Sequence, residues 1–134
     1  MASDLVAFVR VRLDEDEQIA TDASGASWAE PWRGATWHAG ETNRIGVLRD
    51  DGIPVCGHSW PSQMDHIARH DPARALREVA AKRRIVDAVV ATWNASCDPT
   101  DDFWVGLAPT QTATLRLLAS CWSDHPDFRQ EWST

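Results

Sequence analysis

Residues 66–90 constrain the fold more than any other stretch, because Asp71-Pro72 divides them into two helical segments. Asp71 is a favourable N-cap, and Pro72 suits the first helical position, where its missing N–H costs no hydrogen bond. The pattern therefore predicts a helix from Pro72 to about residue 95, roughly 36 Å long. Near-heptad spacing of its apolar residues indicates one buried seam. The seam comprises Leu76, Val79, Val86, Val90 and Trp93.

A shorter helix precedes the long one, with Ser62 as its predicted N-cap and His70 as its end. Residues 62–95 thus form a helix, a turn and a long helix. A third helix is predicted over residues 1–23, ended by Ser24-Gly25, because apolar residues recur there at intervals of three and four. These residues are Leu5, Val6, Phe8, Val9, Leu13 and Ala20.

The last main helix is predicted over residues 109–123, with Pro109 in its first turn. Its apolar face is formed by Leu115, Leu118 and Trp122, and is broadened by Leu117 and Cys121. The tail, residues 124–134, carries Phe128 and Trp132 as apolar anchors, so we expect it to pack back on the domain.

Between the first and second helices, residues 28–57 read as a small antiparallel sheet. Three short strands are predicted around residues 35–38, 44–48 and 53–56, the last two joined by the tight-turn sequence Asp50-Asp51-Gly52. We therefore predict an α+β fold in which about three main helices pack on a three-stranded, Trp-rich antiparallel sheet. The chain length fits a single domain, residues 1–134.

The net charge of −7 argues against a protein that coats nucleic acid. The charge is unevenly placed, however: residues 66–84 are basic, whereas residues 1–22 and 98–134 are acidic. The simplest use of this pattern is pairing within the molecule. No apolar run approaches the ~18 residues that cross a bilayer, and no secretory signal opens the chain. Three widely spaced cysteines favour reduced thiols, so we expect a cytoplasmic protein with no membrane partner.

Three sets of residues are candidates for function. The first is a basic face that could meet phosphates, although pairing with the acidic helices or plain solvation is favoured. Its members are Arg69, Arg74, Arg77, Lys82, Arg83 and Arg84.

The second set is a pair of histidines, His66 and His70, whose spacing of four places both imidazoles on one helical face. Upstream Cys56 and His58 could complete a four-ligand zinc site. In the other interpretation, His70 lies beside an N-cap and only forms a hydrogen bond with the turn. We expect no cofactor, and zinc is the alternative.

The third set is aromatic, because Trp28, Trp32, Trp37 and Trp60 lie in or beside the predicted sheet. Such rings could stack a base, a sugar or a peptide side chain, with Arg33 beside Trp32 as a binding residue. The favoured interpretation is that these large aromatics build the contact between the sheet and the helices.

Five segments resemble an uncharacterised family of small proteins, a domain of unknown function, from actinobacteria and their phages. They are residues 4–17, 66–79, 82–85, 114–119 and 124–132. The resemblance covers both ends and the central helix, is loose over residues 24–60, and implies an origin without an activity.

No nucleophile motif, phosphate-binding glycine loop or dinucleotide fingerprint is present in the sequence. We therefore favour a binding or adaptor protein, phage-related and acting on a bacterial protein through protein–protein contacts. A nucleic-acid-associated regulator that uses residues 69–84 is the second hypothesis, and a metal-dependent enzyme that uses His66 and His70 is the third. The sequence also leaves a homo-oligomer open.

Overall fold

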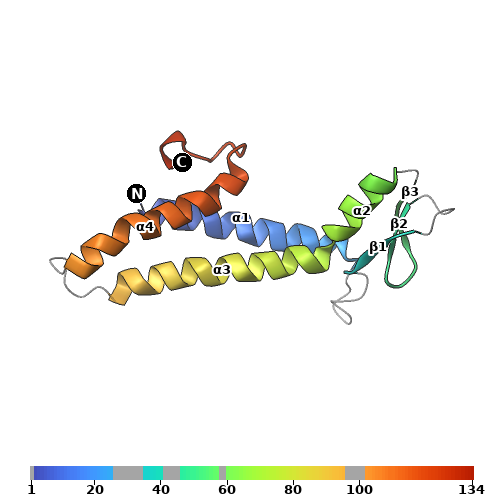
Figure 1. Ribbon diagram of the computed structural model, residues 1–134, viewed down its shortest axis with the longest axis horizontal. Helices are drawn as coiled ribbons and strands as arrows, with labels where there is room; N and C mark the ends of the chain where they lie inside the picture. Colours follow the sequence, from blue (N-terminus) through green and yellow to red (C-terminus); the bar gives the residue numbers. More distant parts are fainter. Residues whose placement is uncertain (1, 26–34, 41–45, 58–59, 96–101) are drawn as a thin grey trace. The chain divides into compact units, whose positions relative to one another are not determined.

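The computed structural model describes residues 2–25, 35–40, 46–57, 60–95 and 102–134 (Figure 1). Helices and a three-stranded antiparallel sheet make up these ranges, which confirms the predicted α+β class. The helices are α1 (Ala2–Ala23), α2 (Pro61–Arg69), α3 (Pro72–Ala95) and α4 (Asp102–Ala119), with short 3-10 helices η1 (Ser120–Trp122) and η2 (Gln130–Trp132). The strands are β1 (Trp37–Ala39), β2 (Gly46–Arg49) and β3 (Pro54–Gly57).

The chain divides into two compact units. The first comprises residues 1–14 and 80–134, and the second comprises residues 15–79. The first unit therefore holds the start of α1, the second half of α3, α4 and the tail. The second unit holds the end of α1, the sheet, α2 and the start of α3.

The sheet of the second unit is the predicted meander, in the order β1-β2-β3. Strands β1 and β3 begin two residues and one residue later than their sequence patterns suggested, and the register pairs Trp37 with Arg49 and Gly46 with Gly57. The predicted start of β2, residue 44, lies outside the described residues. The turn after β2 is the predicted one, since the Arg49 N–H donates to the Ile53 carbonyl and Gly52 has a φ of 81°. The connection between β1 and β2 lies mostly outside the described residues.

Helix α2 packs against the sheet through Met64, its buried residue. The Met64 sulfur accepts a hydrogen bond from the backbone N–H of Gly46 (3.0 Å). The predicted cap at Ser62 was wrong: Trp60 holds the N-cap position, and its N–H donates to Gln63 Oε1 (3.1 Å). Pro61 explains the shift, because proline favours the first helical position.

Asp71 attaches the start of α3 to this sheet. As predicted, it caps the helix: Oδ1 accepts the Arg74 N–H (2.7 Å). Its other oxygen, Oδ2, accepts the backbone N–H of Trp37 at the start of β1 (3.3 Å). A second donor of the first helical turn, the Ala73 N–H, bonds the Ala35 carbonyl (3.0 Å). One carboxylate, 7% exposed, thus joins helix and strand.

The core of the first unit lies among α1, α3 and α4. Every apolar residue predicted to be buried on α1 is buried, and Val86 and Leu115 meet this core with no exposed surface. The α3 seam was only partly predicted. Val79 and Val86 are buried, but Val89 takes the place expected for Val90, and Leu76 and Trp93 are half-buried. A straight α-helix has 3.6 residues per turn, so a strict seven-residue repeat drifts off the buried face.

Helix α4 begins at Asp102, seven residues before the predicted start, and Pro109 lies inside it. The expectation that Pro109 opens the helix was therefore wrong. An internal proline removes one backbone hydrogen bond, and here the helix continues across that loss. Leu115 is buried as expected, whereas Leu117 is 60% exposed and does not broaden the apolar face.

Ion pairs within the first unit join α1 and α3. Arg83 on α3 bonds Asp14 on α1 (2.6 Å), and Arg10 on α1 bonds Asp87 on α3 (3.1 Å). The first of these two pairs has the sense that the charge pattern predicted, with the base on α3 and the acid on α1, and the second has the opposite sense. Across the described ranges, no helix is long and apolar enough to cross a membrane.

Candidate functional site

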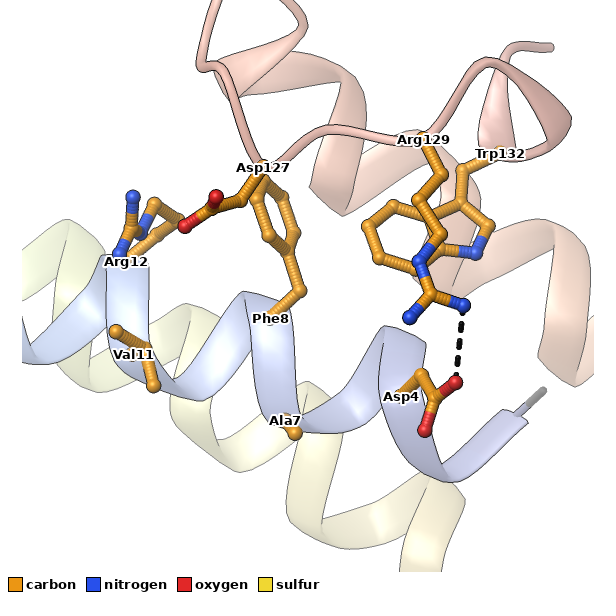
Figure 2. Close-up of a pocket in the computed structure, with 8 residues that line it drawn as sticks. All are labelled: Asp4, Ala7, Phe8, Val11, Arg12, Asp127, Arg129 and Trp132. Atoms are coloured by element: carbon orange, nitrogen blue, oxygen red, sulfur yellow. Dashed lines mark hydrogen bonds and ion pairs between the residues drawn. The ribbon is translucent and has the colours of Figure 1, made fainter.

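A groove in the first unit lies between the start of α1 and the C-terminal tail (Figure 2). It encloses about 320 Å³, at the low end of the ~300–1,000 Å³ typical of ligand sites. Apolar atoms contribute more of its surface than polar atoms. The lining residues are Asp4, Ala7, Phe8, Val11, Arg12, Asp127, Arg129 and Trp132.

The helical period of α1 sets one wall of the groove. Val11 lies four residues after Ala7 and three after Phe8, so the three side chains lie on neighbouring parts of one helical face. Phe8 is turned inward and buried, whereas Val11 is 48% exposed. A half-exposed valine beside a buried phenylalanine gives the wall an apolar surface that solvent reaches.

The tail supplies the opposite wall through Trp132 on η2, which is 3% exposed. Its ring lies 5.1 Å from the Phe8 ring, centroid to centroid, and 5.9 Å from Phe128. Phe8 and Phe128 are also 6.0 Å apart in an edge-to-face arrangement. Each such pair is worth about 0.5–1.5 kcal/mol beyond the area it buries, so the aromatic cluster holds the tail on α1.

Four charged side chains line the groove, and two of them form an ion pair. Arg129 donates to Asp4 Oδ2 (3.0 Å), and its guanidinium lies 5.2 Å from the Trp132 ring centroid, as Figure 2 shows. Both partners are about half exposed, so the ion pair itself contributes little stability. Arg12 and Asp127 line the other end. With two acids and two bases, the rim has no net formal charge.

Arg12 is buried, with 6% of its surface exposed, although it lies on the apolar face of α1. Its Nη1 contacts Nε2 of His125, and its guanidinium lies 5.6 Å from the Phe8 ring centroid. The His125 ring is in turn 6.0 Å from Phe8, and its Nδ1 accepts the backbone N–H of Asp127 (3.1 Å). These contacts fix the position of the tail that forms the groove.

The indole N–H of Trp132 is buried and makes no hydrogen bond to any residue that the structure describes. Buried donors of this kind are uncommon and cost about 1–3 kcal/mol each. The contribution of Trp132 to the groove therefore comes from its ring and not from its N–H.

In a comparison with protein-family models, residues 2–134 match a family of unknown function (DUF6221). The chain belongs to this family. The comparisons with curated proteins and with solved structures found no match. Membership supports the resemblance to an uncharacterised family and assigns no activity to its members, so the groove has to be interpreted from its own chemistry.

In this member of the family, the predicted basic face divides into engaged and exposed side chains. Lys82 Nζ lies 5.2 Å from the Trp122 ring centroid, Arg83 pairs with Asp14, and Arg74 pairs with Glu78 on the same helix (2.7 Å). The remaining members are exposed and form no ion pair with a described residue: Arg69, Arg77 and Arg84.

Of the four predicted metal ligands, the structure brings together His66 and His70, both exposed, with ring centroids 4.5 Å apart. Cys56 is half-buried on β3 and is not part of a disulfide. In the described ranges, no three His, Cys, Asp or Glu side chains gather where they could hold a metal ion together. His58 lies outside these ranges.

The predicted aromatic platform is described only in part, because Trp28, Trp32 and Arg33 fall outside the described residues. Trp37 is half-buried on β1. Trp60 does not build a contact between sheet and helices, since it is 76% exposed at the start of α2.

The groove itself was not predicted from the sequence, although one signal pointed to it. Arg12 follows Leu5 and Phe8 at seven and four residues, which places a charged side chain on the apolar stripe of α1. A charge on a buried face needs a partner. That partner, His125, is 113 residues away, and no local pattern links the two.

Proposed function

We propose that this protein is a non-enzymatic binding or adaptor protein, and that its groove takes a peptide segment of a protein partner. One observation carries the proposal: the groove pairs an apolar wall, with Val11 48% exposed, with a rim of two acids and two bases. Interfaces bury apolar and aromatic surface at their centre and keep charged groups at their rim.

The occupant that fits this surface is a segment with one bulky apolar side chain and little net charge. A volume near 320 Å³ suits one or two side chains and not a folded domain. The balanced rim offers no excess positive charge for phosphates, whose binding depends on released counterions. Binding should therefore change little with salt.

Selection from a displayed library of random peptides tests the proposal. We expect selected peptides to share an aromatic or long aliphatic residue. Val11→Asp should weaken their binding at least roughly 10-fold, about 1.4 kcal/mol, because it places a charge on the apolar wall. Ile19→Asp is the matched control: Ile19 is 66% exposed on the same helix and lies outside the groove lining.

The proposal fails if no peptide family is selected, or if Val11→Asp and Ile19→Asp affect binding equally. Circular dichroism of both variants shows whether each retains its fold, which we expect because both positions are exposed.

Two finer proposals rest on the sequence. Its resemblance to small actinobacterial and phage proteins supports a bacterial protein as the partner. Neither Cys56 nor Cys121 is part of a disulfide, which supports a reducing, cytoplasmic setting.

A nucleic-acid-associated regulator is the second candidate. It is favoured by Arg69, Arg77 and Arg84, whose exposed side chains form no ion pair with a described residue. Steep loss of binding with added salt would distinguish this function from peptide binding.

A further inference from the structure

Helix α2 presents two histidines on the side opposite its anchor. Met64 faces the sheet and is buried. His66 and His70 lie two and six residues after Met64, and each of these spacings places a side chain about half a turn around the helix from Met64. Both imidazoles are exposed. Neither makes a hydrogen bond or ion pair with any residue in the described parts of the chain. Their ring nitrogens are therefore available to a ligand from solvent.

The two rings are close enough to share one ion. Their centroids are 4.5 Å apart, and the ring planes meet at 44°. An ion bound to one nitrogen of each ring at ~2.0–2.1 Å lies roughly 3.2 Å from each centroid. The observed separation then corresponds to a nitrogen–metal–nitrogen angle of roughly 90°, the angle between adjacent positions in square-planar or octahedral coordination.

The backbone holds this pair in place. His70 is the C-cap of α2, and its N–H bonds the carbonyls of His66 (3.1 Å) and Ile67 (3.2 Å). The last turn of the helix thus fixes the second histidine relative to the first. Asp65 is one residue from His66, so it points about 100° away and does not join the pair.

We propose that His66 and His70 form a two-nitrogen chelate for a divalent transition metal, Cu²⁺ or Ni²⁺. Imidazole nitrogens suit both ions, and both prefer the tetragonal geometry that a 90° angle provides. Water completes the coordination. Tetrahedral Zn²⁺, which prefers a wider angle between its ligands, binds more weakly. This site differs from the four-ligand zinc site because it uses neither Cys56 nor His58.

Calorimetric titration of the tag-free chain with Ni²⁺ tests the proposal. We expect one ion per chain, tighter binding of Cu²⁺ and weaker binding of Zn²⁺. Electron paramagnetic resonance of the Cu²⁺ complex should show two nitrogen ligands. Bound metal should also raise the melting temperature by several °C, because the chelate forms only in the folded helix.

Three variants identify the ligands. His66→Asn and His70→Asn should each weaken Ni²⁺ binding roughly 100-fold, because one nitrogen alone provides no chelate. His38→Asn, at an exposed histidine on β1, is the matched control and should bind as the parent chain does. Unchanged affinity in either of the first two variants, or an equal loss in His38→Asn, would overturn the proposal.

Discussion

Asp71 joins two elements of the second unit through its carboxylate. Its two oxygens serve two backbone donors on different elements, the Arg74 N–H of α3 and the Trp37 N–H of β1. The sequence identified the cap, because the pattern Asp-Pro before a helical run is local. It did not identify the bond to β1, because Trp37 lies 34 residues away.

Replacement of Asp71 should therefore cost more than the loss of a helix cap. We expect Asp71→Ala to lower the free energy of unfolding by about 2–4 kcal/mol, since it removes both the cap and the bond to β1. Asp71→Asn should lose about half as much, because one amide oxygen can serve only one of the two donors. Urea denaturation measures both. If Asp71→Asn were as stable as the parent chain, the bond that it loses would contribute nothing, which would contradict a role for both bonds.

Gly46 allows β2 and β3 to approach closely. A Cβ atom at this position would lie 2.2 Å from the Cys56 carbonyl oxygen, and its φ of 157° also favours glycine. Gly52 has a positive φ as well, but nothing lies within 4 Å of its Cβ position. A comparison of alanine substitutions at the two glycines therefore distinguishes the free-energy cost of steric crowding from that of backbone conformation.

We expect Gly46→Ala to destabilise the protein by about 3 kcal/mol or more, because the strands must separate. Gly52→Ala should cost only about 1 kcal/mol, the strain of a left-handed residue. Thermal or denaturant melts give both values. A similar cost at the two positions would contradict the close contact between Gly46 and Cys56.

At the scale of elements, the tail and the start of α1 depend on each other. The tail contributes Trp132 and Phe128 to the ring cluster around Phe8, and Arg129 to the ion pair with Asp4. The rings are the stronger link, because Phe8 and Trp132 are buried and the ion pair is half exposed.

Two substitutions of Trp132 should distinguish the contribution of its ring to stability from that of its N–H. Trp132→Ala should lower the stability by about 3–5 kcal/mol, as for other large buried aromatics. Trp132→Phe should cost only about 1 kcal/mol, because the indole N–H makes no hydrogen bond to a described residue. Denaturant melts of the two variants check this. A loss in Trp132→Phe as large as in Trp132→Ala would mean that the N–H has a partner.

Helices and strands were predictable where the controlling signals are local. The apolar stripe of α1 and the turn at Asp50-Asp51-Gly52 identified their elements directly. The start of α4 was missed because proline is typical of a first turn, while tertiary structure tolerates Pro109 within the helix. The groove could not be predicted, because it joins residues as far apart as Asp4 and Arg129, 125 positions along the chain.

At the scale of the whole molecule, charge separates the two candidate functions. The chain carries a net charge of −7, and several predicted phosphate-binding residues are engaged within the protein, Arg83 with Asp14 among them. We therefore expect no measurable binding of a labelled DNA duplex at physiological salt, measured by fluorescence polarisation. Micromolar binding that weakens steeply with salt, and is reduced by Arg77→Ala, would favour the regulator instead.

The central claim is that a partner segment contacts the apolar wall of the groove beside Val11. Site-specific photo-crosslinking tests it most directly, with a benzophenone side chain at position 11 or, as the control, at position 19 of the same helix. With a peptide selected for binding, we predict adducts at position 11 and none above background at position 19. Equal adducts at both positions, or adducts at position 19 alone, would contradict a binding site in the groove.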